Sequence, residues 1–288
     1  MVAMSNITDA ALAEAYGYAQ TVDTTTYLSA AINATDLVIT VADAGRFSRG
    51  MVQIGDELLM VDEVDRTANT LTVGSVAGRG IRGTAAGSHA IGDLVTMSPS
   101  IPRHQAVVAV EEAIRGADGL FRVAEVDIVA QSAQSAYTLP GEAKSILHAK
   151  WLPPGPSDEW IALRRYRHDK YTGQIIVHDN PLPGRTIKVT YTADPLVPTQ
   201  AQDFSVSGLP DSCTDVIRLG AIWRIVSFLE PYNLLAKSAE MEAMDRQKTP
   251  GNRLRVSQYY YGLYQQRLMQ EIGSLQSDYP IRVTFGTW

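Results

Sequence analysis

The sequence is short of cysteine and of long hydrophobic runs. Cys213 is its only cysteine in 288 residues, so no disulfide can form within the chain. The longest wholly apolar stretches, such as Ala106–Val110, have about five residues, whereas a membrane-spanning helix needs about 20. Residues 1–10 contain no basic region followed by an apolar core, the pattern of a secretion signal. We therefore expect a soluble, disulfide-free, globular chain.

Positive charge is also scarce. The chain carries 25 Lys and Arg against 31 Asp and Glu, a formal charge of −6. Residues 1–100 hold 5 basic and 11 acidic residues, so the whole acidic excess lies in the first third. A protein that grips a nucleic-acid backbone needs several cations on one face. The composition therefore argues against tight nucleic-acid binding.

The sequence offers no catalytic or metal-ligating set. No two histidines have metal-ligand spacing, and one cysteine cannot build a thiolate site. There is neither a Gly-x-Ser-x-Gly elbow nor a Gly-Lys-Ser/Thr triplet. We therefore predict no catalytic residues, no cofactor and no metal, and surface or hydrogen-bonded roles for the histidines. These are His89, His104, His148, His168 and His178.

Two polar motifs each have a structural and a functional interpretation. Gly78–Gly83 matches the G-x-G-x-x-G of dinucleotide sites, but no amphipathic helix follows it, so we expect glycines that serve turns. Five carboxylates fall within Asp56–Asp65, where they could bind Ca²⁺ or act in acid–base catalysis. Their spacing lacks the order of a calcium loop, so we expect a hairpin with a solvated acidic face.

Aromatic residues offer one further possibility. Trp151, Trp160, Tyr166 and Tyr171 could form a carbohydrate-binding face, although aromatics at alternating strand positions are more often part of a core. Arg164–Arg167 is a short basic cluster with one aromatic and acidic neighbours, a weak footprint for nucleic acid.

The order of apolar patterns predicts an α+β fold. Helical periodicity occurs at the start, middle and end, and β-rich runs fill both gaps. We expect a helical body with two inserted antiparallel β modules, the first a small barrel or sandwich and the second a larger β-sandwich. The predicted parts are an N-terminal helix (1–23), a small β module (24–99), a central helix (100–119), a β-sandwich (120–207), C-terminal helices (208–276) and a docking tail (277–288).

Local signals place several boundaries. Met51–Ile54 and Glu57–Val61 flank Gly55-Asp56, which predicts a tight hairpin. Thr8 is a candidate cap for the first helix, and Pro231 predicts a break between two C-terminal helices. The last helix is expected over about Arg253–Ile272.

The C-terminal tail alternates apolar residues. An isolated strand leaves its backbone groups unpaired, so this segment must either complete an internal sheet or add to a partner's sheet edge. We favour the partner. The predicted docking residues are Tyr279, Pro280, Ile281, Val283, Phe285 and Trp288.

One string of residues resembles a known family. Val52–Val61, Leu71–Val73, Arg79-Gly80 to Gly83-Thr84, His89 and Gly92–Val95 together look like a β module that recurs in structural proteins of tailed bacteriophages. The helical frame around it is similar to head-to-tail connector proteins, the adaptors below the portal ring. The smallest adaptors are nearly all helix, and this sequence departs from them by its two β insertions.

The resemblance implies a non-enzymatic virion protein assembled in the host cytoplasm. It would form a homo-oligomeric ring, typically of twelve copies, that binds the portal protein through the tail and receives the next stopper or tail component. DNA would at most pass through the ring, and no membrane is involved. We expect the acidic first module to project outward. The alternatives are a carbohydrate-binding virion or surface module and, less favoured, a nucleotide-binding enzyme.

Overall fold

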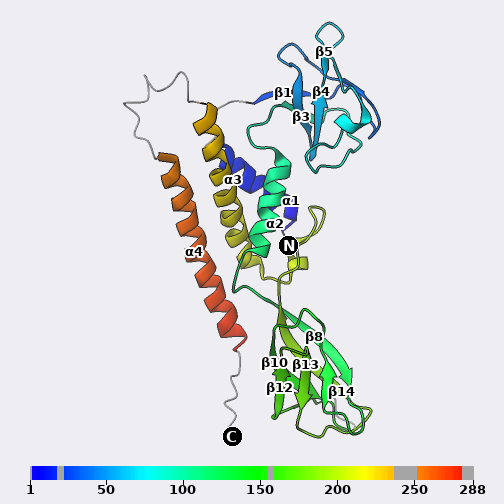
Figure 1. The fold of residues 1–288 in the computed structure, drawn as a ribbon, viewed down its shortest axis with the longest axis vertical. Coiled ribbons are helices and arrows are strands. Elements are labelled where there is room, and N and C mark those ends of the chain that lie inside the picture. Colours follow the sequence, from blue (N-terminus) through cyan, green and yellow to red (C-terminus); the bar gives the residue numbers. More distant parts are fainter. Residues whose placement is uncertain (1, 18–22, 155–158, 237–251, 281–288) are drawn as a thin grey trace. The chain divides into compact units, whose positions relative to one another are not determined.

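The computed structural model describes residues 2–17, 23–154, 159–236 and 252–280 (Figure 1). The chain has an α+β fold, which confirms the predicted class: helices frame two antiparallel β modules. It divides into two compact units, one of residues 5–113 and 218–262 and the other of residues 1–4, 114–217 and 263–288. The α-helices are α1 (Met4–Tyr16), α2 (Arg103–Arg115), α3 (Thr214–Ala236) and α4 (Asn252–Asp278).

The first β module consists of two antiparallel sheets. One has the strand order β1-β7-β3-β4 and the other β2-β6-β5. The predicted hairpin is confirmed, because Ile54 pairs with Glu57 across a turn in which Gly55 has a φ of 57°. The strands are β1 (Thr24–Tyr27), β2 (Val38–Thr40), β3 (Gly50–Ile54), β4 (Glu57–Val61), β5 (Glu63–Asp65), β6 (Thr70–Thr72) and β7 (Leu94–Met97).

The core of the first module lies between its two sheets. Ile39 and Leu71 come from the smaller sheet, and Val52, Leu59 and Val95 come from the larger one; all five are buried in one hydrophobic cluster. The module is therefore a sandwich and not a closed barrel. The chain enters on β1 and leaves on β7, which are neighbouring strands with Thr24 opposite Met97.

The second module is a larger sandwich of the same kind. Its sheets have the orders β11-β10-β14-β8 and β12-β13-β9. Tyr137 and Ile175 from the smaller sheet share one buried cluster with Ile187 and Val189 from the larger one. The first and last strands again pair, with Arg122 opposite Ala193. The strands are β8 (Arg122–Val129), β9 (Ala136–Thr138), β10 (Ser145–Trp151), β11 (Ile161–Ala162), β12 (Tyr166–Asp169), β13 (Gln174–Val177) and β14 (Thr186–Ala193).

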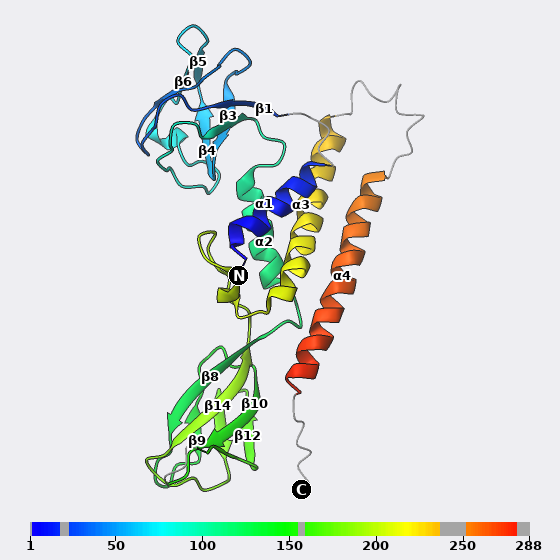
Figure 2. The same cartoon turned by 180° about the vertical axis from the view of Figure 1, so that it is seen from behind.

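Helix α1 lies alongside α2 and α3, as both ribbon views show (Figures 1 and 2). Polar contacts fix this position: the Tyr16 hydroxyl donates to the Ile101 carbonyl just before α2, and Glu14 accepts from Arg218 of α3 and Tyr260 of α4. Ala11 and Ala15 of α1 are fully buried.

In the other unit, α4 is tied to the residues around the start of α3. The Ser212 hydroxyl donates to Glu271 over 2.6 Å, and the same carboxylate forms an ion pair with Arg267 one helical turn earlier. The Tyr264 hydroxyl donates to the Gly116 carbonyl. These bonds hold α4 by polar contacts as well as by its buried side chains Leu268 and Leu275.

Three predicted helix boundaries are wrong. Thr8 does not cap α1 but lies buried inside it, because the helix begins four residues earlier, where the Met4 N–H donates to the Gln202 carbonyl. Pro231 does not end α3, which continues to Ala236, since a proline removes one backbone hydrogen bond and a helix can continue past it. α4 extends beyond Ile272 through Gly273 to Asp278.

Candidate functional site

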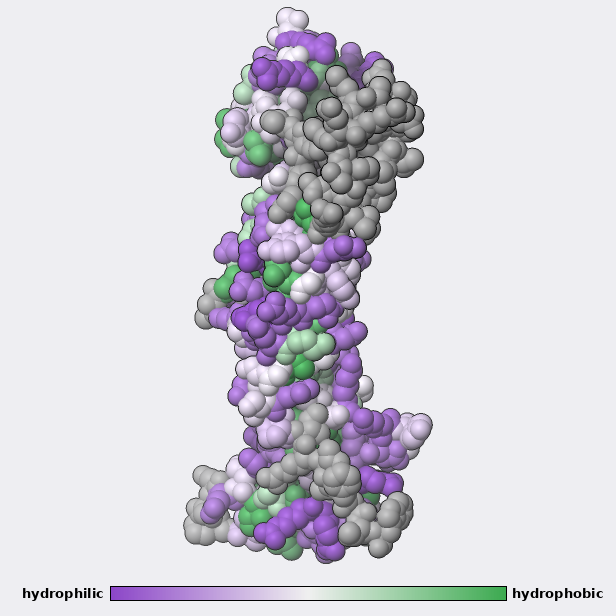
Figure 3. All heavy atoms as spheres, turned by 90° about the vertical axis from the view of Figure 1, so that its left-hand side faces the viewer, coloured by the Kyte–Doolittle hydropathy of each residue, from purple (hydrophilic) through white to green (hydrophobic). Residues whose placement is uncertain are grey.

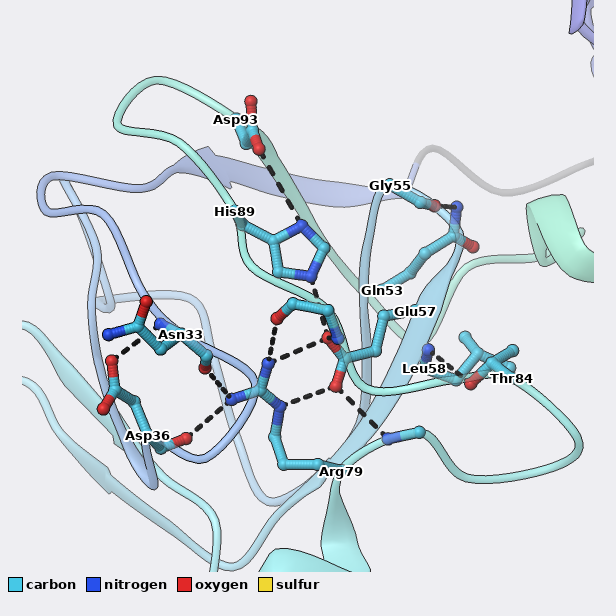
Figure 4. A network of polar contacts seen from close by, with 12 residues as sticks. Asn33, Asp36, Gln53, Gly55, Glu57, Leu58, Arg79, Thr84, His89 and Asp93 are labelled. Atoms are coloured by element: carbon cyan, nitrogen blue, oxygen red, sulfur yellow. Dashed lines mark hydrogen bonds and ion pairs between the residues drawn. The ribbon is translucent and has the colours of Figure 1, made fainter. Parts of the chain in front are cut away.

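The most elaborate polar cluster in the described residues lies inside the first β module (Figure 4). It has three charged or titratable members. Glu57 opens β4 directly after the hairpin turn, Arg79 follows a single 3₁₀ turn at Val76–Gly78, and His89 lies in the loop before β7. The Glu57 and Arg79 side chains are almost fully buried, with 1% and 0% of their surface exposed.

All five N–H groups of the Arg79 guanidinium have acceptors. Nε and one Nη2 hydrogen bind the two oxygens of Glu57 over 2.6 and 2.9 Å, in the bidentate geometry that arginine and carboxylate favour. The other Nη2 hydrogen reaches the Gly87 carbonyl over 3.0 Å. Nη1 donates to the carbonyls of Asn33 and Asp36 over 3.0 and 2.7 Å. One side chain thus holds three separate loops.

Glu57 is equally well supplied with donors. Besides Arg79, it accepts from the backbone N–H groups of Gly80 and Gly87 over 3.2 and 3.1 Å. His89 Nε2 lies 2.8 Å from its Oε2, and His89 Nδ1 lies 3.8 Å from the Asp93 carboxylate. Burial alone would raise the pKa of Glu57, but the hydrogen bonds from Arg79, His89 and Gly87 outweigh it and hold the pKa below its ordinary value.

This arrangement is suited to holding structure and not to catalysis. Glu57 stays ionised because a buried cation and several donors stabilise its charge, so it is a poor proton donor near neutral pH. All five donors of Arg79 are used within the chain, which leaves none for a substrate. The network therefore acts as an internal clamp on the loops of the module.

The glycine string serves turns, as the sequence predicts. Gly80 has a φ of 62°, and a Cβ there would lie 2.6 Å from the Ala86 nitrogen. The chain's own loop therefore occupies the space beside the glycine, where a dinucleotide site would need room for a pyrophosphate. No helix follows Gly83 until α2 begins at Arg103.

The acidic hairpin is only partly as predicted. Glu57 is the clear error, since we expected it on a solvated face and the structure buries it against Arg79. Asp56 is exposed and forms an ion pair with Arg103. Asp62 accepts from the Gly74 N–H, and Asp65 accepts from two N–H groups in its own turn. These contacts turn the carboxylates to separate backbone partners and do not gather them round one ion.

The described residues contain no group of three or more His, Cys, Asp or Glu side chains that could hold a metal ion. His89 and His148 are hydrogen-bonded, as expected. His168 differs from the prediction: its Nδ1 is buried without a hydrogen-bond partner among the described residues, and burial, with Lys170 nearby, lowers its pKa.

The aromatic residues do not form one exposed face. Trp151 and Tyr166 are partly buried and pack against the core of the second module. Lys188 lies over the Trp160 ring at 5.1 Å, while Tyr171 is fully exposed. In the basic cluster, Arg165 forms an ion pair with Asp179, whose carboxylate also accepts from the Arg164 N–H.

One hollow lies at a loop end of the second module. Its volume is about 360 Å³, and polar side chains dominate its lining. Of the candidate site residues named from the sequence, only His178 lines this hollow. The lining residues are Gln131, Ala133, Gln134, Ser135, Val177, His178, Asp179, Asn180 and Pro181.

Of the predicted docking residues, only Tyr279 and Pro280 are described, and residues 277 and 278 of the predicted tail belong to α4. Tyr279 is 40% exposed, and its ring meets that of Phe121 edge-on at 6.5 Å. Pro280 is exposed. Ile281, Val283, Phe285 and Trp288 lie outside the described residues.

Comparison with known proteins adds no relative. A scan against models of protein families and a search of curated proteins both found no match. No helix in the described ranges is long and apolar enough to cross a membrane. On the face drawn in Figure 3, hydrophobic surface is broken into separate areas by hydrophilic surface.

The sequence pattern contains all three charged or titratable residues of the network but does not indicate that they contact one another. Glu57, Arg79 and His89 all belong to the string that resembles the phage module. A charged residue in an otherwise apolar strand, Glu57 before Leu58-Leu59, was the available signal, because such a residue is buried only when it is paired.

Proposed function

We propose that this chain is a structural virion protein, a head-to-tail adaptor that forms a ring under the portal and joins it to the next connector or tail component. The proposal includes a ring of about twelve copies, a non-enzymatic role and a location at the head–tail junction. Its tail, Tyr279–Trp288, would dock on the portal protein, with DNA at most passing through the ring.

The observation that carries this proposal is that the residues resembling the phage β module form an internal hydrogen-bond network in the fold. The polar residues Glu57, Arg79 and His89 satisfy one another and the loop backbone, so they define a rigid module. These residues resemble a family of structural proteins, and their contacts hold the loops of the module together. Both facts favour a structural role for the chain. The two sandwiches inserted between helices agree with a helical body that carries accessory modules.

The two alternatives gain less support. A carbohydrate site needs exposed aromatic platforms, but Trp151 packs against a core and Trp160 lies under Lys188. A nucleotide enzyme needs space at the glycine string, and there the chain's own loop fills it. A glycan array with binding that depends on Trp160, or a calorimetric titration showing dinucleotide binding, would favour the corresponding alternative.

The first test of the proposal is imaging. Electron micrographs of the purified chain, alone and mixed with the portal protein of the same virus, are expected to show rings that stack on the portal. A chain that stays monomeric at high concentration and leaves the portal bare would contradict the adaptor function.

The second test concerns the tail. Replacing Ile281, Val283 and Phe285 by serine should abolish co-sedimentation with the portal, because it removes the apolar side of an extended segment. The matched control, Arg282→Ser with Thr284→Ala, changes the opposite side of the segment. Its co-sedimentation with the portal should be closer to that of the wild type than the co-sedimentation of the serine variant is. Portal binding that survives deletion of Asp278–Trp288 would refute tail docking.

A further inference from the structure

Strand β8 is an unusually long sheet edge. It is the outer strand of the sheet β11-β10-β14-β8 and has eight residues, whereas no other edge strand among the described residues has more than five. It pairs with β14 along its whole length, from Arg122 opposite Ala193 to Val129 opposite Thr186. Long unpaired edges invite the addition of another strand.

The ladder shows which backbone groups are available. The Ala130 N–H donates to the Arg185 carbonyl, so even-numbered residues of β8 turn their backbone groups toward β14. Val123, Glu125, Asp127 and Val129 therefore turn theirs outward. Within the part of the chain that the structure describes, these outward N–H and C=O groups form no backbone hydrogen bond.

Several common protections against a further strand are absent from this edge. Sheet edges are often blocked by proline, by a bulge or by charged side chains, above all lysine. β8 has no proline, no lysine and an unbroken register with β14, and its exposed charges are the carboxylates of Glu125 and Asp127. Its two faces differ in character. Val126 and Ile128 are partly buried and pack against the core of the module, whereas Glu125 and Asp127 are exposed on the other face.

The sequence Ile281–Trp288 matches this edge in its alternating pattern. In an extended strand, Ile281, Val283 and Phe285 share one face and Arg282 and Thr284 the other. The apolar face would continue the one formed by Val126 and Ile128. Arg282 would meet the face of Glu125 and Asp127, where Lys188 of β14 already forms an ion pair with Glu125 over 3.4 Å.

We propose that the outer edge of β8 accepts residues 281–288 of a second copy of this chain as an added strand. The contact joins two different surfaces, a tail on one copy and an edge on the next, and such a contact repeats around a ring when the rotation closes. It goes beyond the proposed portal docking. A tail paired with β8 is not free for the portal, so portal binding would displace it.

The test is disulfide cross-linking between two differently tagged chains without any portal protein. One chain carries Val123→Cys, Glu125→Cys or Asp127→Cys, and the other carries Thr284→Cys. Mild oxidation is expected to give the mixed dimer with at least one of the three positions. The native Cys213 does not interfere, because it is buried and burial, with Glu271 nearby, raises its pKa to about 12.

A matched control uses another acidic edge. Glu63 is exposed on β5, an edge strand of the first module, so Glu63→Cys with Thr284→Cys should cross-link only at the rate of random collision. Excess synthetic peptide of residues 278–288 should suppress the mixed dimer at β8. Mixed dimer at no β8 position, or as much of it with Glu63→Cys, refutes the proposal.

Charge reversal gives a second measurement. Asp127→Lys should slow cross-linking through Glu125→Cys by about fivefold, because it repels Arg282, and Arg282→Glu on the other chain should restore it. A doubly substituted chain that forms only the intrachain disulfide would show pairing within one copy and overturn the proposal. None of these outcomes depends on whether the tail also binds the portal.

Discussion

Arg79 is a single residue on which several loops depend. Its side chain is fully buried, and a charge in that position is tolerated only while its counter-charge and its acceptors are all present. Removing one partner therefore costs more than the pair contributes to stability, because the remaining charge stays buried without compensation.

Glu57→Gln should destabilise the first module by about 3–5 kcal/mol near neutral pH, since it leaves the Arg79 cation buried without a carboxylate. Chemical denaturation followed by circular dichroism measures this loss. Glu63→Gln, an exposed change in the same module, is the control and should alter stability little. Equal stability of the two variants would show that the network contributes nothing.

Glu57 should also make the stability of the first module depend on pH. The pKa of Glu57 is lower in the folded chain than its ordinary value of 4.5, so its contribution is present above that value and is lost as the pH falls through the folded pKa. The stability difference between wild type and Glu57→Gln should therefore shrink below about pH 4.5. Denaturation curves of both proteins from pH 7 to pH 3 test this, and a difference that stays constant would contradict it.

The burial of Glu57 also shows what the sequence could not supply at this scale. Charge patterning places a carboxylate beside four others and predicts a solvated face. The residue that neutralises Glu57 is 22 positions away, and only the folded loops bring it into contact. Long-range pairing of this kind is not visible in local spacing.

At the scale of loops and strands, Gly80 is the most constrained glycine of the string. Gly80→Ala should destabilise the first module by about 2–4 kcal/mol, because its positive φ disfavours a side chain and the added Cβ meets the Ala86 backbone. Gly92→Ala is the matched control: its φ is 88° but nothing lies within 4 Å, so only the cost of the left-handed backbone, about 1 kcal/mol, is expected. Thermal melts compare the two.

At the scale of helices, the bond from Ser212 to Glu271 anchors α4. Ser212→Ala should cost about 1.5–3 kcal/mol, the usual range for a hydrogen bond to a charged group. Glu271→Gln and the double variant complete a cycle, in which the Ser212 effect should shrink once the carboxylate is gone. Independent, additive effects would mean that the bond does not stabilise this end of α4.

Elements with a clear local signal were the ones that the sequence predicted well. The hairpin at Gly55-Asp56 follows from two apolar runs around a two-residue turn, and it is present with the expected register. The predictions from Thr8 and Pro231 were wrong because they relied on local preferences for helix ends, which the surrounding structure overrides. α1 begins at Met4, whose N–H donates to the carbonyl of Gln202, far away in the sequence, and α3 continues past Pro231.

At the scale of the molecule, the two sandwiches have separate hydrophobic clusters with no residue in common. We therefore expect at least two unfolding transitions, since separate cores need not melt together. Glu57→Gln should move only the transition of the first module. Labelling of the buried Cys213 thiol should follow a different transition. A single transition shifted as a whole would contradict this.

The outward orientation of the acidic first module stays a prediction. The carboxylates of residues 43–65 include Glu57, which is neutralised inside the fold by Arg79. Because Arg79 belongs to the same first third of the chain, burial of this pair removes one negative and one positive charge together and leaves the acidic excess at the surface unchanged. A structure of the assembled ring that places Asp56 and Asp62 in the contact between subunits would refute the prediction.

The pairing of first and last strands in each module has a consequence for how such proteins change over time. Because Thr24 lies opposite Met97 and Arg122 lies opposite Ala193, each sandwich begins and ends at one point. A gene could therefore gain or lose either sandwich by a single insertion or deletion at one loop, with the flanking helices left intact. We therefore expect related chains to differ by whole sandwiches, and their helices are the part to align first.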